Sequence, residues 1–264
     1  MCTLTWRITP GGYQVLFNRD ELKTRSLALN PDSFDRQKNG QRVTAFMPID
    51  PDGNGTWICC NNYGLSLCLL NNYQGITPKT AIRSRGLLVK ELAFCQSYIQ
   101  VLSQIQNINL STFAPFTLVI FAQENIAQDQ AVPAIRWDGI KLHHIKKIGP
   151  VTSSSFEFKT VQANRLAQYH YNYSQYQYNR TQDSLHKQPS FCQLMSYHMS
   201  HQPTSSAYSV CMHRNDAQTV SLTIINVEPN TVSMDYHAGS PCQSNPLHAL
   251  TQPRVINTEM EIEI

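Results

Sequence analysis

The chain opens with apolar side chains that alternate with polar or smaller ones, a pattern typical of half-buried β-strands. Residues 2–8 and 13–18 follow this pattern on either side of the turn Pro10-Gly11-Gly12. Strands joined by so short a turn pair as an antiparallel hairpin. The hairpin is predicted to bring Cys2 close to Arg19.

A second hairpin is predicted over residues 55–70, with its turn at Asn61-Asn62-Tyr63-Gly64. This hairpin delivers Asn71 and Asn72 at the end of a strand. Short apolar runs predict further strands at 116–122, 134–137, 140–145, 208–213, 219–227 and 231–237.

Helical periodicity appears between these groups of strands. Residues 84–95 and 98–105 carry apolar stripes at spacings of three and four, which predict two packed helices. The same spacing returns from residue 158, where Arg165 falls within an otherwise apolar stripe, and a further helix is expected over 191–199.

The order of elements indicates the fold class. Strands, two helices, more strands, more helices and closing strands fit two mainly antiparallel sheets covered by helices. We therefore expect an α+β protein with a four-layer αββα sandwich. A chain of 264 residues commonly forms one domain, so we assign residues 1–251 to a single domain and 252–264 to a loose tail.

Charge and hydropathy exclude several classes of protein. The formal net charge of +3 comes from scattered residues without a basic run, so nucleic acid is not an expected partner. The N-terminus lacks a secretory signal, and the longest apolar run, 116–122, is too short for a membrane span. We expect a soluble, cytoplasmic protein, and homo-oligomerisation stays open.

The eight cysteines do not form a recognisable metal or disulfide framework. No Cys-x-x-Cys occurs, and Cys59 and Cys60 point to opposite faces of any strand. Most cysteines are expected to be buried and reduced, with no metal and no cofactor. A redox or metal role for them is the weakest of three functional hypotheses.

Cys2 is the residue with the clearest chemical potential. Removal of Met1 would expose an α-amine with a pKa near about 7.7–8, able to accept the thiol proton and return it to a leaving amine. Arg19 would favour the thiolate, and the Asp20 carboxylate would hold the ammonium. Asn71 or Asn72 would donate to an oxyanion.

Each of these residues also has a purely structural interpretation. A cysteine at position 2 can be incidental, and charged residues at the end of a strand commonly form a solvated turn. The paired asparagines suit a turn, and Arg165 can extend along its apolar stripe to solvent.

Taken in order, the short motifs of this chain resemble the NRDE family, named for its Asn-Arg-Asp-Glu motif, which includes the transport and Golgi organisation proteins. The motifs are Met1-Cys2-Thr3-Leu4, Phe17-Asn18-Arg19-Asp20-Glu21, Gly55-Thr56-Trp57, Asn61-Asn62-Tyr63-Gly64, Ser84-Arg85-Gly86, Trp137-Asp138-Gly139 and Thr152-Ser153-Ser154-Ser155. The closing segments 209–213 and 239–242 are similar to the end of penicillin acyltransferases.

The resemblance extends to N-terminal nucleophile (Ntn) hydrolases, namely penicillin V acylases and bile salt hydrolases. It implies an αββα fold with Cys2 as nucleophile and base and with Arg19 and Asp20 beside it, although those hydrolases space their aspartate further from the arginine. The oxyanion asparagine of the hydrolases matches Asn71 best, with Asn72 as the alternative.

Two further positions follow from the resemblance. A second hydrolase asparagine falls near Ser153, where a shorter hydroxyl stands instead. The late arginine of the hydrolases has no clear match, and Arg165 is our candidate because its helical face points inward.

Two functions remain open. The first is an amidohydrolase or acyltransferase that acts on a small acylated amine through a thioester on Cys2. The second is a non-catalytic protein that binds or carries a lipid, an acyl thioester or a haem-like ligand, as the resemblance allows. The segment 169–186, rich in aromatic residues, would suit a lid over such a ligand.

Overall fold

The computed structural model describes residues 1–38, 40–126, 131–147, 149–177, 188–243 and 247–255. Its strands form two sheets in which every pairing is antiparallel. The first sheet has the order β10-β1-β2-β11-β12-β13 and the second has the order β3-β4-β5-β6-β7-β8-β9.

The six-stranded sheet consists of β1 (Cys2–Thr9), β2 (Gly12–Leu22), β10 (Val151–Ser153), β11 (Ala217–Val227), β12 (Thr231–Ala238) and β13 (Leu247–Pro253). The seven-stranded sheet consists of β3 (Leu29–Lys38), β4 (Gln41–Ile49), β5 (Ile58–Asn61), β6 (Ser66–Asn71), β7 (Phe116–Phe121), β8 (Val132–Trp137) and β9 (Leu142–Lys147).

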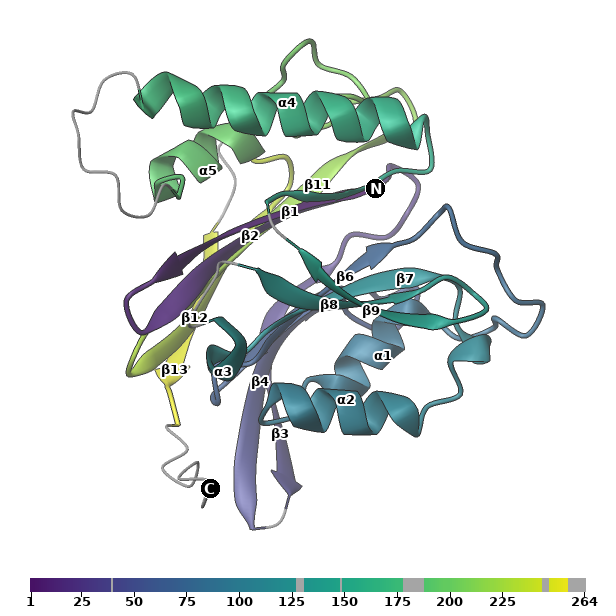
Figure 1. Ribbon diagram of the computed structural model, residues 1–264, viewed down its shortest axis with the longest axis vertical. Coiled ribbons are helices and arrows are strands. Elements are labelled where there is room, and N and C mark those ends of the chain that lie inside the picture. The colour runs from purple at the N-terminus through teal and green to yellow at the C-terminus, as the bar shows by residue number, and fades with distance from the viewer. Residues whose placement is uncertain (39, 127–130, 148, 178–187, 244–246, 256–264) are drawn as a thin grey trace.

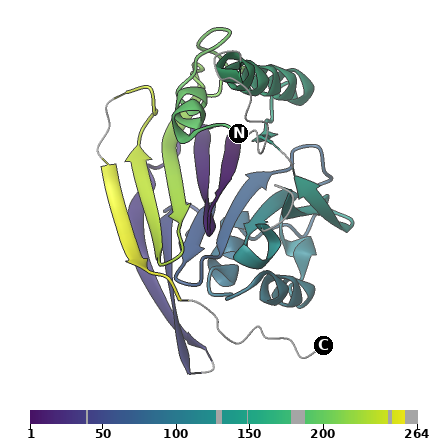
Figure 2. The same cartoon turned by 60° about the vertical axis from the view of Figure 1, so that its left-hand side comes forward.

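Helices cover the outer faces of both sheets (Figures 1 and 2). The helices α1 (Arg85–Leu92) and α2 (Tyr98–Gln106) lie on one side of the molecule, and α4 (Phe158–Gln177) and α5 (Phe191–His198) lie on the other. A short helix α3 (Gln123–Ile126) and a 3₁₀ turn (Leu110–Thr112) complete the set in the described residues. The predicted four-layer αββα sandwich is confirmed.

The largest apolar clusters lie between adjacent layers. One fills the space between the sheets, where Leu4, Phe17 and Phe121 are fully buried and Cys2 packs at its edge. Another lies between the seven-stranded sheet and α1 and α2, with Leu88 and Val101 at its centre. The inner face of each sheet is largely apolar, and the polar residues Thr5, Asn18 and Asp20 of β1 and β2 lie on the opposite face, toward α4 and α5.

Several elements differ from the sequence prediction. The segment 208–213 was predicted as a strand, but it contributes only an isolated bridge between His213 and Gln218. Its backbone is instead held by Ser200 and by the Ser209 hydroxyl. The hairpin of β3 and β4 was not predicted, because β3 is a largely polar edge strand that contains Pro31.

The C-terminal boundary also shifts. Strand β13 runs through Gln252 to Pro253, past the predicted domain end at 251. The next two backbone amides donate hydrogen bonds, Arg254 to the Asn230 carbonyl and Val255 to the Asn62 carbonyl. Residues 256–264 of the predicted tail, like much of the predicted lid at 169–186, lie outside the described residues.

The expectations for cysteines and for membrane spans can be compared with this fold. The cysteines are free, and most of them are buried, including Cys59 and Cys60. In the described ranges, no helix combines the length and the apolar character that crossing a bilayer requires.

A buried histidine joins the first sheet to α5. The ring of His198 is fully buried, with Nε2 at 2.8 Å from Thr5 Oγ1 and Nδ1 at 2.9 Å from Asn18 Oδ1. Since an amide oxygen only accepts, Nδ1 carries the proton and Nε2 accepts from the Thr5 hydroxyl. The imidazole is therefore held in one neutral tautomer.

Acidification is expected to destabilise the fold through His198. Burial, aided by the charge of Arg165, lowers the pKa of His198 to about 3, whereas an unfolded chain titrates its histidines near about 6.5. Between these values only the unfolded state binds the proton. The free energy of unfolding therefore decreases as the pH is lowered, by up to about 1.4 kcal/mol per pH unit. At pH values above this window, the contribution of His198 to the free energy of unfolding does not change with pH.

Urea unfolding of wild type and His198→Gln across this pH window tests the expectation. In this window the free energy of unfolding of the variant should depend less steeply on pH than that of wild type, by the equivalent of close to one bound proton. This difference is expected even though the variant is less stable at neutral pH. Equal slopes in the two proteins would assign the acid sensitivity to other groups.

Candidate active site

The hairpin of β1 and β2 fixes the position of Cys2. The Met1 amine donates to the Asp20 carbonyl at 3.1 Å, and the Asp20 amide donates to the Met1 carbonyl at 2.9 Å. Cys2 and Arg19 form the next pair in register. Because such pairs alternate, Cys2 and Arg19 are a non-hydrogen-bonded pair whose side chains stand close together on one face.

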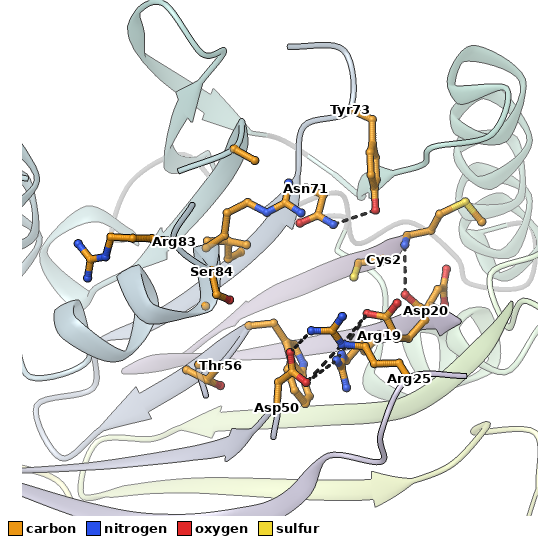
Figure 3. A pocket seen from close by; sticks show the side chains of 18 residues that line it. Cys2, Arg19, Asp20, Arg25, Asp50, Thr56, Asn71, Tyr73, Arg83 and Ser84 are labelled. Atoms are coloured by element: carbon orange, nitrogen blue, oxygen red, sulfur yellow. Dashed lines mark hydrogen bonds and ion pairs between the residues drawn. The ribbon is translucent and has the colours of Figure 1, made fainter. Parts of the chain in front are cut away.

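A pocket of about 350 Å³ opens at this point (Figure 3). Cys2, Arg19 and Asn71 line it together. Its other lining residues are Met1, Asp20, Glu21, Arg25, Asp50, Gly55, Thr56, Trp57, Leu69, Tyr73, Arg83, Ser84, Arg85, Gly86 and Ala114. Strands of both sheets and the start of α1 thus share one cavity.

Arg19 is held in the pocket wall by an aromatic ring and two carboxylates. Its guanidinium lies 4.1 Å from the centroid of the Trp57 ring, and Nη2 is 3.5 Å from Glu21 and 3.7 Å from Asp50. The side chain is only 7% exposed. This arrangement places a fixed positive charge beside the Cys2 thiol.

A second arginine completes this charged cluster. Arg25 approaches Asp50 to 2.5 Å, and this hydrogen bond raises the pKa of Arg25. Asp50 therefore joins Arg25 to Arg19 in the lining of the pocket (Figure 3).

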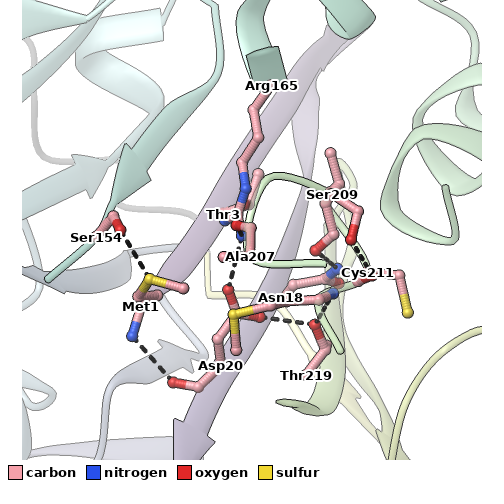
Figure 4. A network of polar contacts seen from close by, with 12 residues as sticks. Met1, Thr3, Asn18, Asp20, Ser154, Arg165, Ala207, Ser209, Cys211 and Thr219 are labelled. Atoms are coloured by element: carbon pink, nitrogen blue, oxygen red, sulfur yellow. Dashed lines mark hydrogen bonds and ion pairs between the residues drawn. The ribbon is translucent and has the colours of Figure 1, made fainter. Parts of the chain in front are cut away.

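Asp20 points in the opposite direction from Arg19. Its carboxylate is fully buried and accepts hydrogen bonds from Thr219 Oγ1 at 2.7 Å and from Arg165 Nη2 at 3.2 Å (Figure 4). Successive residues of a strand face opposite sides of the sheet, so Asp20 contributes only backbone to the pocket. The expectation that the side chains of Arg19 and Asp20 would both reach the site of Cys2 is thereby corrected for Asp20.

Arg165 lies behind the pocket rather than in it. Its side chain is fully buried, and Nη1 donates to Thr3 Oγ1 at 2.5 Å while Nη2 also donates to the Ala207 carbonyl at 3.4 Å. The inward direction predicted for this residue is observed, but its partner is Asp20. Arg165 can position Asp20, and it does not reach the space where a ligand would bind.

The surroundings of the Cys2 thiol favour its neutral form. Burial raises its pKa, while the positive charge of the amino terminus opposes the shift. Activation of this thiol therefore requires a proton acceptor close to its sulfur.

The structure distinguishes between the two asparagines. Asn71 ends β6 and lines the pocket, where its Nδ2 donates to the Tyr73 hydroxyl at 2.8 Å. Asn72 instead directs Nδ2 toward the Trp137 carbonyl at 3.4 Å. Asn71 is thus the residue available to a ligand, and within the described part of the chain only one of its two amide hydrogens meets an acceptor.

Ser153 is the last residue of β10 and lies opposite Cys2 of β1. The two residues are directly opposed in register, so their side chains lie on the same face of the sheet. The Ser153 side chain is buried, and its Oγ has no hydrogen-bond partner among the described residues. Ser153 does not line the pocket, but its unpaired hydroxyl is adjacent to Cys2.

Other pocket residues were not singled out from the sequence. Tyr73 and Arg85 enter the cavity from the loop after β6 and from the first turn of α1. Arg85 is in a motif quoted for the family resemblance, which was a usable signal. Arg25 and Asp50 stand in segments without periodicity, and no pattern in a single sequence marked them.

Two solved structures with a similar fold are described as hydrolases. A variant of the conjugated bile acid hydrolase from Clostridium perfringens matches with 14% identity and a TM-score of 0.52, covering 97% of each chain. The Caenorhabditis elegans ortholog of N-acylethanolamine-hydrolyzing acid amidase matches with 12% identity and a TM-score of 0.54, covering 92% of this chain and 94% of its own. At such identities the likeness shows the fold, which is that of the Ntn hydrolases.

The family follows from the sequence itself. The family model described as Transport and Golgi organisation 2 matches residues 1–244. The chain belongs to this family, which confirms the resemblance seen in the motifs. Among curated proteins, no match to the chain was found.

Removal of the Arg165 charge is expected to destabilise the fold strongly. Arg165→Met preserves much of the volume but leaves the Asp20 carboxylate buried without its ionic partner, which costs about 3–5 kcal/mol. The double variant Arg165→Met with Asp20→Asn should recover part of this loss, because no charge is then left buried. Urea unfolding of both singles and the double variant gives the coupling energy, and strictly additive losses would contradict the pairing.

Proposed function

We propose that this protein is an amidohydrolase or acyltransferase whose nucleophile is Cys2, exposed by removal of Met1. The observation that carries the proposal is the convergence of Cys2, Arg19 and Asn71 on one pocket. A thiol, a fixed cation and an amide donor are the groups that acyl transfer through a thioester requires.

Removal of Met1 would alter the site in two ways. It would create the α-amine of Cys2 as a proton acceptor next to the thiol. It would also take away the carbonyl that now accepts from the Asp20 amide at 2.9 Å. The freed N–H would be a further donor at the edge of the pocket.

The proposed reaction begins when the α-amine accepts the thiol proton. The thiolate attacks the carbonyl carbon of the substrate, and Asn71 Nδ2 donates to the developing oxyanion. The carbon–nitrogen bond then breaks, and the ammonium returns its proton to the leaving amine. Water, or an acceptor amine, resolves the thioester and regenerates Cys2.

Ser153 and Asp20 have supporting roles in this proposal. The unpaired Ser153 hydroxyl is available to the new amine or to the oxyanion. Asp20 and Arg165 act as positioning residues, because their buried pair fixes the part of β2 from which Arg19 projects.

The pocket charges favour an anionic substrate. Arg19 and Arg25 are matched by Glu21 and Asp50. Arg85 forms no ion pair with a carboxylate of the described residues, and its Nη1 donates only to the Pro115 carbonyl at 3.1 Å. Burial lowers the pKa of Arg85, so a bound anion would stabilise its charge. We infer that the substrate is a small acylated amine that carries a negative group.

The decisive measurement is the intact mass of the protein purified from its natural host, before and after reaction with an acylating thiol probe. Loss of Met1 and a single label mapped to Cys2 are expected. Cys192, the exposed cysteine of α5, provides the internal reference for unactivated thiols. Cys2→Ala should leave the fold intact and abolish both labelling and amide turnover.

A different outcome would favour the second function. In the structure, Met1 itself lines the pocket and its sulfur lies 2.8 Å from Ser154 Oγ. If Met1 is retained and Cys2 reacts no faster than Cys192, the pocket has no amine base, and a ligand-binding protein for a lipid, an acyl thioester or a haem-like molecule becomes the better assignment.

Substrate charge can be tested at Arg85. Arg85→Gln should raise KM for anionic acyl amides by about 10–100-fold, because a hydrogen bond to a charged group contributes about 1.5–3 kcal/mol. KM for a neutral amide of the same acyl chain should change little. Lys90→Gln, an exposed change on the same helix, is the matched control. If Arg85→Gln raised KM equally for the anionic and the neutral amide, the inference of an anionic substrate would be wrong.

A further inference from the structure

A second cluster of reactive side chains lies outside the pocket. His201, Cys211, His213 and Cys242 each direct one ligand atom into a common space, and these atoms all lie within 4.8 Å of one another. None of the four residues lines the pocket of Cys2. The cluster therefore needs an explanation separate from the proposed acyl chemistry.

The distances within the cluster match a tetrahedral metal centre. His213 Nε2 lies 3.6 Å from Cys211 Sγ and 3.4 Å from Cys242 Sγ. In a tetrahedron with zinc–sulfur bonds of about 2.3 Å and zinc–nitrogen bonds of about 2.0–2.1 Å, sulfur and nitrogen ligands stand about 3.5 Å apart. Both sulfur–nitrogen distances are therefore those expected of ligands that share one ion.

Donor chemistry selects the metal. Two thiolates and two imidazoles form one of the common ligand sets of structural zinc. The two thiolate charges balance the charge of the ion, which reduces the cost of placing it beside the buried Cys211. Ca²⁺ and Mg²⁺ prefer oxygen ligands and do not suit this set.

The backbone around the cluster is already fixed. The Cys211 amide donates to the Ser200 carbonyl at 3.0 Å, next to His201 in sequence. On the other side, Ser240 Oγ donates to the Thr219 carbonyl at 2.7 Å and holds the turn that carries Cys242. Segments far apart in the sequence are thus held at the first residues of β11 by contacts that do not involve a metal.

We propose that His201, Cys211, His213 and Cys242 bind one zinc ion with a structural role. Binding would displace the two thiol protons to solvent and form two zinc–sulfur and two zinc–nitrogen bonds. The ion would join the segment after α5 to the turn after β12. This proposal does not depend on the activity proposed for Cys2.

The test begins with the full chain, produced without a metal-binding tag in zinc-supplemented medium and kept reduced. Elemental analysis after desalting should find one zinc per chain, and cobalt substitution should give the absorption of a tetrahedral thiolate complex. Chelation should lower the melting temperature, and added zinc should restore it.

Variants separate binding from folding. Cys242→Ser, at a half-buried position, and His201→Ala should each weaken zinc binding by at least about tenfold in competition with a chromophoric chelator. Cys192→Ser, at an exposed position of α5, should bind zinc as wild type does. Circular dichroism checks that each variant is folded.

Three results would overturn the proposal. Wild-type protein could bind no zinc when the ion is supplied under reducing conditions. The ligand variants could retain wild-type affinity, which would place the metal elsewhere. Peptide mapping could find Cys211 joined to Cys242 as a disulfide in protein held with zinc, which would make the cluster a redox pair.

Discussion

The buried ion pair between Asp20 and Arg165 is the interaction on which the arrangement of the site depends. Both side chains are fully buried and lie 3.2 Å apart. Removing two charges from water is costly, and the attraction between them compensates only when further hydrogen bonds satisfy their remaining atoms. Thr219 supplies one to Asp20, and Thr3 supplies an acceptor to Arg165.

This pair controls the direction of Arg19. Once the Asp20 carboxylate is committed to the side of α4 and α5, strand geometry turns Arg19 to the other face. On that face Arg19 meets Trp57 and Asp50, which both come from the segment between β4 and β5 of the second sheet. A contact in the outer layer thereby places a cation in the pocket between the sheets.

The pocket itself is built from segments that contribute unequally to its rigidity. Cys2 is paired on both sides, with Arg19 on β2 and Ser153 on β10, so its backbone has little freedom. Asn71 stands at the last residue of β6, and Arg85 stands in the first turn of α1. Cys2 is thus held between two neighbouring strands, whereas Asn71 and Arg85 are each held from one side, at the ends of their elements.

The sequence predicted much of this arrangement because it depends on local rules. The short turn at Pro10-Gly11 set the register that pairs Cys2 with Arg19. The direction of Asp20 also follows from the period of a strand, because two successive residues such as Arg19 and Asp20 cannot both face the pocket. The edge strand β3 escaped prediction because its residues are polar and its pairing depends on β4.

Other features depend on contacts between distant segments and leave no local pattern. The segment 208–213 has an apolar run that suits a strand, yet side chains of Ser209 and Thr219 satisfy its backbone in the fold. The cluster of His201, Cys211, His213 and Cys242 has none of the short spacings that mark most zinc sites. Only the fold brings these four residues together.

An irregularity in β11 connects these two regions. The pairing with β2 shifts between Thr219 and Ser221, which is the mark of a β-bulge, and bulges redirect a side chain at the cost of ladder hydrogen bonds. Here the Thr219 hydroxyl accepts from the Met212 amide at 2.8 Å and donates to Asp20. Met212 lies between Cys211 and His213 in sequence. Whatever fixes that segment therefore also fixes Thr219, and through Thr219 the carboxylate that orients β2 beside Cys2.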